Sequence, residues 1–123
     1  MKAAIINKTG GPEVIELKDI VLEKPGKDEV SIEQKAIGLN YIDTYHRSGL
    51  YPLKLPIGLG LEGAGLITEV GSNVKNFKAG DKVAYAAIPL GSYSTHRNFP
   101  ASKIVKIPEG VDFEVAATLM TKG

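Results

Sequence analysis

Short alternating runs dominate the pattern of hydrophobic and polar positions along this chain of 123 residues. In residues 29–37, Val30 and Ile32 alternate with Ser31 and Glu33, so one face is apolar and the other is wet. This period of two is typical of a half-buried strand, and glycine or proline separates most such runs. The pattern predicts about seven strands, over residues 2–6, 14–21, 29–37, 66–70, 82–87, 92–99 and 103–107.

Residues 40–48 have a different character and predict a helix. Asn40 can cap its start, Asp43 lies in the first turn, where the helix dipole favours an acid, and Gly49 stops it. A second short helix is predicted from Asp112 through Leu119.

Many short strands in so few residues favour closure of the sheet, because closure hides the strand edges. We therefore predict a mainly β fold, a small, partly open barrel with short helices. The turn at residues 77–81 is expected to join two strands, with Gly80 supplying a positive φ.

Composition excludes several classes of function. The chain is 43% hydrophobic and 24% charged. Its net charge of +1 provides no long-range electrostatic attraction to nucleic acid, so a nucleic-acid role is not expected. It has no cysteine, hence neither a disulfide nor a thiolate metal site, and no apolar run approaches the roughly 20 residues of a membrane span. The N-terminus lacks the features of a signal peptide, so a cytoplasmic location is expected.

The glycines at 58, 60 and 63 fit the letters of the dinucleotide-binding fingerprint G-x-G-x-x-G. That fingerprint needs a buried strand before it and a helix after it, whose N-terminus faces the pyrophosphate. Here Pro56 and Ile57 precede it, and the strand-like residues 66–70 follow it. We interpret the glycines instead as positions where two backbones pass closely.

Several motifs in a fixed order resemble the N-terminal domain of zinc-free medium-chain quinone oxidoreductases of the zeta-crystallin type. They are residues 40–52, 58–65 and 70–74 and the Gly80-Asp81-x-Val83 turn, and the resemblance runs from Gly10 to Ala117. It implies a GroES-like barrel, a separate Rossmann domain, NADPH as hydride donor and a quinone or similar electron-poor small molecule as acceptor.

The wider superfamily includes zinc alcohol dehydrogenases, which hold zinc through cysteine and histidine. The resemblance places Asn40 where those enzymes have a cysteine and Leu61 where they have a histidine. His46 and His96 have no second ligand near them in the sequence. We therefore expect no metal site.

The resemblance also implies a set of binding residues. It assigns the nicotinamide side of the cofactor to Asn40, Tyr41, Ile42, Asp43 and Thr44, and the acceptor pocket to Tyr45 and Tyr51. From the residues alone, helix capping explains Asn40 and Asp43 equally well, and the tyrosines suit packing at the edge of the barrel. Glu62, between glycines, is either a buried acid that needs a partner or a polar group at the cleft. The sequence identifies no general base.

A quinone is already electrophilic, so its reduction needs mainly contact between the nicotinamide and the acceptor ring, with a hydrogen-bond donor near the oxygen that gains charge. After residue 107, no βαβ unit follows that would hold the phosphates and the adenosine. We expect residues 1–123 to be one domain that stops before the Rossmann domain and is inactive alone. NADPH, in preference to NADH, is implied by the resemblance only.

Two alternatives stay open. One is a zinc-free enone or enoyl-thioester reductase of the same superfamily. The other is a free-standing barrel that acts as an interaction module, since a fold does not carry a function by itself. The physiological acceptor, one- or two-electron transfer and a homodimer of the full-length enzyme are left open.

Overall fold

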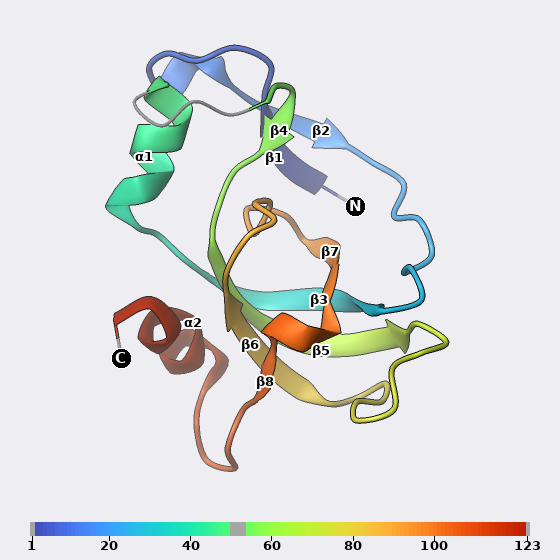
Figure 1. Ribbon diagram of the computed structural model, residues 1–123. Coiled ribbons are helices and arrows are strands. Elements are labelled where there is room, and N and C mark those ends of the chain that lie inside the picture. The colour runs from blue at the N-terminus through green and yellow to red at the C-terminus, as the bar shows by residue number, and fades with distance from the viewer. Residues whose placement is uncertain (1, 50–53, 123) are drawn as a thin grey trace.

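The computed structural model describes the backbone of residues 2–49 and 54–122, and their side chains except at residues 41 and 118–122. Within this part, two antiparallel sheets and two α-helices make a mainly β fold (Figure 1). The fold class predicted from the strand pattern is confirmed.

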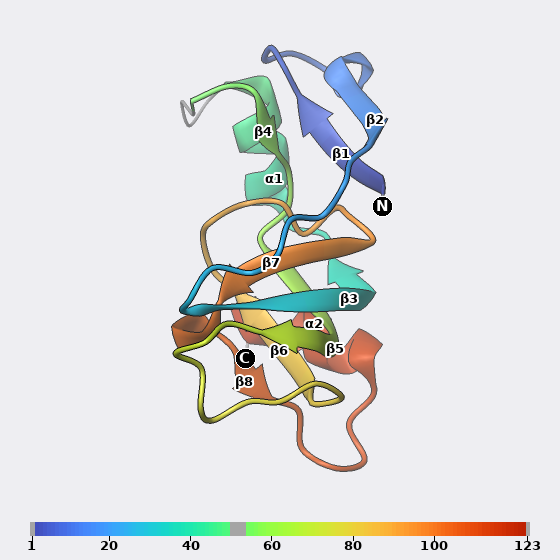
Figure 2. The same cartoon turned by 90° about the vertical axis from the view of Figure 1, so that its right-hand side faces the viewer.

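The smaller sheet lies with one helix at one end of the molecule, and the larger sheet lies with the other helix at the opposite end (Figures 1 and 2). The smaller sheet has the strand order β2-β1-β4, with bounds β1 (Lys2–Ile6), β2 (Ile15–Asp19) and β4 (Ile57–Gly58). The larger sheet has the order β7-β3-β5-β6-β8, with bounds β3 (Glu29–Gly38), β5 (Glu62–Val70), β6 (Lys82–Ala86), β7 (His96–Pro100) and β8 (Val105–Lys106). The helices are α1 (Tyr41–Ser48) and α2 (Phe113–Lys122), and two 3₁₀ turns are η1 (Pro12–Val14) and η2 (Ala101–Lys103).

The main core lies on one face of the five-stranded sheet. Its fully buried members include Val30 and Ile32 of β3 and Ile67 of β5, at the alternating positions that the sequence pattern predicts. The rings of Tyr85 and Phe99 pack against each other there, with centroids 4.3 Å apart.

Small side chains form the contact between the larger sheet and α2. Ala64 and Ala84 on the sheet meet Ala116 and Ala117 on the helix, and all four are buried. Alanine leaves little bulk between the two backbones, so α2 can pack directly against β3, β5 and β6.

As predicted, a strand and not a helix follows Gly63. The strand β5 begins at Glu62, four residues before the predicted start at Leu66. A Cβ atom added at Gly65 would lie 2.2 Å from the carbonyl oxygen of Glu33 on β3. The predicted close approach of two backbones is found at Gly58 and Gly60, where an added Cβ would lie 3.1 Å from Cα of Gly91 and 2.9 Å from the backbone nitrogen of Tyr93. At Gly63 the nearest atoms belong to side chains instead.

The predicted strand over residues 92–99 is wrong in its first half, because β7 begins only at His96. In this first half, backbone carbonyl groups accept hydrogen bonds from the side chain of Gln34 and not from a neighbouring strand. Its Nε2 donates to the carbonyl oxygen of Ser92 at 2.6 Å and to that of Ser94 at 3.2 Å.

Two other predicted strands start too early. Val14 belongs to the turn η1, since Pro12 fixes a φ that suits a helical turn, and β2 starts at Ile15. Lys103 likewise ends the turn η2, so β8 is limited to Val105–Lys106.

The helix α1 ends where the sequence predicts. Gly49 follows it with a φ of 90°, and its N–H donates to the carbonyl oxygen of Tyr45 at 3.1 Å. Gly80, in the turn before β6, has the predicted positive φ, at 95°. The end of α1 is tied to the loop after β1, because the N–H of Gly10 donates to the carbonyl oxygen of Arg47 at 2.9 Å.

Candidate functional site

The start of α1 is built from its own first residues. Asn40 has an extended backbone (φ −132°, ψ 150°), and the helix begins at the next residue. The Asp43 carboxylate accepts a hydrogen bond from the backbone N–H of Asn40 at 3.1 Å, as in a capping box. Asn40 therefore occupies the N-cap position that the sequence predicts.

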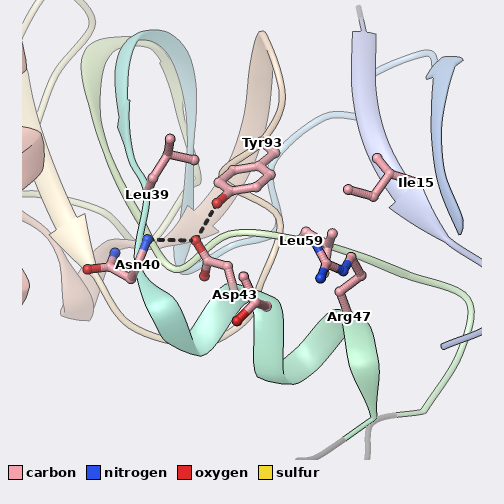
Figure 3. A pocket seen from close by; sticks show the side chains of 8 residues that line it. Ile15, Leu39, Asn40, Asp43, Arg47, Leu59 and Tyr93 are labelled. Carbon is pink, nitrogen blue, oxygen red and sulfur yellow. Dashed lines mark hydrogen bonds between the residues drawn. The ribbon is translucent and has the colours of Figure 1, made fainter. Parts of the chain in front are cut away.

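A second hydrogen bond, from the loop between β6 and β7, holds Asp43 in place. Figure 3 shows the Tyr93 hydroxyl donating to the same oxygen, Oδ2, that accepts from Asn40. Asp43 is only 4% exposed. Burial of Tyr93, and then its hydrogen bond to the Asp43 carboxylate and that group's negative charge, raise the pKa of the tyrosine well above its usual range. Tyr93 thus stays protonated, with its proton directed at Asp43.

A cavity of about 570 Å³ lies along this face of α1 (Figure 3). Its volume falls in the range of small-molecule sites, roughly 300–1,000 Å³. Apolar side chains and a few polar groups line it: Ile15, Leu39, Asn40, Asp43, Thr44, Arg47, Leu59 and Tyr93. Such a lining suits a flat, largely apolar ligand that carries one or two polar atoms.

The side chain of Asn40 reaches away from the helix toward β5. Its Nδ2 donates to Oε1 of Glu62 at 3.1 Å, and Glu62 is only 1% exposed. Glu62 is thus a buried acid with a partner, as the sequence leads one to expect, and the partner on the neighbouring segment is an amide.

The structure gathers part of the predicted binding set. Asn40, Asp43 and Thr44 line the cavity, whereas Ile42 and Tyr45 are not among its described lining residues. Tyr45 lies on α1 with 38% of its surface exposed.

Two other members of the predicted set cannot be placed. The side chain of Tyr41 and all of Tyr51 lie outside the described residues. The assignment of the whole set to a cofactor and an acceptor remains a prediction.

Several lining residues were missed by sequence reasoning. Tyr93 is 50 positions from its hydrogen-bond partner Asp43, so no local spacing links the two. Ile15 and Leu59 come from the small sheet and the segment after it, and in sequence they look like ordinary core residues.

Among the described residues, no group of three or more histidine, cysteine, aspartate or glutamate side chains is placed to hold a metal ion. His46 is buried on α1, and His96 lies half-exposed on β7, with its Nε2 4.0 Å from a carboxylate oxygen of Glu33. Among the described helices, none has the length and apolar character to cross a bilayer.

The chain is similar to several proteins named quinone oxidoreductase. A quinone oxidoreductase of Pseudomonas aeruginosa is 56% identical over 115 residues, which are 93% of this chain and 35% of that protein. The crystal structure of a quinone oxidoreductase of Pseudomonas syringae pv. Tomato superposes with a TM-score of 0.95 at 52% identity, over 99% of this chain and 38% of that one. The Escherichia coli quinone oxidoreductase complexed with NADPH superposes with a TM-score of 0.93 at 47% identity, over 95% of this chain and 36% of that one.

The chain therefore spans little more than a third of the length of these relatives. The family model described as the alcohol dehydrogenase GroES-like domain matches residues 26–109, which include β3, α1 and all of the larger sheet. This match agrees with the predicted barrel and with the cavity beside α1. The chain therefore belongs to the family of alcohol dehydrogenase GroES-like domains.

Proposed function

We propose that this chain is the substrate-side domain of an NADPH-dependent quinone oxidoreductase that works without zinc. The observation that carries the proposal is the cavity at the start of α1, where Asn40, Asp43 and Thr44 meet an apolar wall. Relatives named quinone oxidoreductase, one of them solved with NADPH, support the choice of acceptor and cofactor.

The residues that line the cavity fit the nicotinamide end of NADPH. A nicotinamide needs partners for its carboxamide, and the polar side chains of Asn40 and Thr44 line the cavity at the start of α1. The phosphates need a glycine-rich turn before a helix N-terminus, whereas Gly63 and Gly65 lie within β5. We therefore assign the phosphates and the adenosine to a separate Rossmann domain beyond residues 1–123, consistent with the partial coverage of the relatives.

When bound, NADPH supplies the hydride. The chain's own residues hold the acceptor ring against Leu39 and Leu59 and keep water away from it. Arg47 lines the same cavity and carries a permanent positive charge, so it can stabilise the acceptor oxygen that gains negative charge. Tyr93 directs its proton to Asp43 and so offers the cavity an acceptor oxygen. We propose Tyr45 and Tyr51 as further contacts of the acceptor.

Asn40 and Leu61 support a reaction that is independent of a metal. Asn40 offers an amide and Leu61 an alkyl group, where a zinc site would need thiolate or imidazole. We further propose that the enzyme acts in the cytoplasm.

A fusion protein tests the proposal. The chain is joined through Gly123 to the dinucleotide-binding domain of the Pseudomonas aeruginosa relative, and NADPH oxidation is followed with 1,4-benzoquinone, with a conjugated enone and with an enoyl thioester. We expect turnover of the quinone by the fusion, none by the chain alone, and no loss of rate with a metal chelator.

Three results would overturn the proposal. A folded fusion that binds NADPH and reduces only the enone or the thioester would assign the chain to the alternative reductases. Loss of activity with chelator, restored by zinc, would refute the metal-independent reaction. A stable complex of the chain alone with a protein partner, without turnover by the fusion, would favour an interaction module.

A further inference from the structure

We propose that Glu62 is a positioning residue, which sets the orientation of the Asn40 side-chain amide at the edge of the cavity. This inference rests on the proposed function, because it assigns Asn40 a contact with the nicotinamide end of the cofactor. It starts from the 3.1 Å hydrogen bond from Nδ2 of Asn40 to Oε1 of Glu62.

Glu62 is held on several sides. It is the first residue of β5, paired with Gly38 of β3 on one side and with Ala86 of β6 on the other. A Cβ atom added at Gly38 would lie 2.3 Å from Oε1 of Glu62 and 2.8 Å from the carbonyl oxygen of Ala117 on α2. The carboxylate thus occupies a slot between two strands and a helix, and only a residue without a side chain fits at Gly38.

Oε1 of Glu62 accepts the hydrogen bond from Nδ2 of Asn40, and an amide has one donating and one accepting end. Glu62 therefore selects one of the two orientations of the Asn40 amide, with nitrogen toward β5. The flipped orientation would set two acceptor oxygens against each other. The selected orientation leaves the amide oxygen as the end of the Asn40 amide that can accept a hydrogen bond from a ligand.

The consequence is that Glu62 affects cofactor binding only through Asn40. A nicotinamide carboxamide has an N–H donor that an amide oxygen can accept, and a freely flipping Asn40 would offer donors half of the time. Because Glu62 is 1% exposed, it has no surface from which to touch a ligand itself.

A double-mutant cycle on the fusion protein tests this, with NADPH affinity measured by fluorescence titration. We expect Asn40→Ala to weaken NADPH binding about tenfold, the size of one lost hydrogen bond. Glu62→Gln should weaken it about twofold, because half of the Asn40 amides are then misoriented. The double variant should be no weaker than Asn40→Ala. Glu69→Gln changes an exposed glutamate of the same strand and serves as the matched control, with unchanged affinity.

A rescue pair separates the contact from general stability. Asn40→Asp sets two carboxylates against each other and is expected to lower the melting temperature of the 123-residue chain. Adding Glu62→Gln to Asn40→Asp restores an amide and a carboxylate in exchanged positions, so the melting temperature should recover. This measurement needs no cofactor. It therefore tests the contact between Asn40 and Glu62 even where the fusion protein does not reduce a quinone and the proposed function is refuted.

The inference is refuted where the losses of NADPH affinity multiply in the double variant, because Glu62 would then act independently of Asn40. It is also refuted where Glu62→Gln lowers the melting temperature and leaves NADPH affinity unchanged, because Glu62 would then serve the fold alone.

Discussion

Gly65 offers the sharpest test of the interpretation that the glycine run is strand backbone. We consider Gly65→Ala, which adds one methyl group in the centre of the larger sheet. Gly65 pairs with Gln34 on β3 and with Val83 on β6, so its strand has neighbours on both sides and cannot move outward.

The size of the effect follows from the contacts of the added atom. The new Cβ would lie 2.2 Å from the carbonyl oxygen of Glu33 and 2.9 Å from Cα of Gln34. An ordinary carbon–oxygen contact is about 3.3 Å or more, so the two backbones must separate by roughly 1 Å. Overpacking of this kind costs about 1–3 kcal/mol, and loss of one hydrogen bond between the strands adds about 1 kcal/mol. We expect Gly65→Ala to lower the free energy of unfolding by about 2–4 kcal/mol.

Thermal and urea unfolding of the chain, followed by circular dichroism, measure this loss. At about 4 °C per kcal/mol for a domain of this size, the melting temperature should fall by roughly 8–16 °C. Gly26→Ala is the matched control, because the atoms nearest to its added Cβ belong to the flexible side chain of Glu29, the closest at 3.1 Å. The control should stay within about 0.5 kcal/mol of the parent chain.

A Gly65→Ala chain that melts with the parent chain would refute the reasoning. Gly65 would then not lie within a paired strand, and the interpretation of the run as a phosphate-binding loop would regain support.

Three further substitutions probe the network around the site. Tyr93→Phe should lower stability by about 1–3 kcal/mol, because Asp43 loses a donor. The fold raises the pKa of Tyr93, so its contribution to the free energy of unfolding is complete below about pH 10 and is lost as the pH rises further. Above about pH 10, the free energy of unfolding should therefore fall less steeply with pH for Tyr93→Phe than for the parent chain. Gln34→Leu should cost about 2–4 kcal/mol in urea unfolding, because the buried hydroxyl of Tyr85, which donates to Gln34 at 2.6 Å, and two loop carbonyls lose their partner. Arg97→Lys should cost about 1–3 kcal/mol by the same assay, because a lysine lacks the planar group that donates to the carbonyl oxygen of Pro89 at 2.8 Å while lying over two aromatic rings. For each of the three, a melting curve that overlies that of the parent would contradict the assigned contact.

Local signals explain which elements the sequence predicted well. The bounds of α1 follow from an N-cap at Asn40, an acid at Asp43 and a glycine at Gly49, all within ten positions of one another. Alternation placed β3 and its buried Val30 and Ile32, because a half-buried strand carries its own period. Ser31, predicted on the exposed face, is buried, with its hydroxyl bonded to Asn98 of β7.

Contacts between distant segments explain what the sequence left out. The early start of β5 depends on pairing with β3 and β6, since glycine has no strand preference of its own. The irregular backbone at Ser92 depends on Gln34, 58 positions away, and the cavity edge depends on Tyr93 meeting Asp43. Sequence reasoning identified the helix that carries the candidate site, but the opposite wall of the cavity could only come from the folded chain.

A crystal structure of the fusion protein with NADPH and a non-reducible quinone analogue tests the central claim most directly. We expect the nicotinamide in van der Waals contact with residues 40–44, its carboxamide beside Asn40, and the analogue in the cavity between Leu39, Leu59 and Arg47. A nicotinamide bound away from α1, with the cavity left to solvent or to packed side chains, would contradict it.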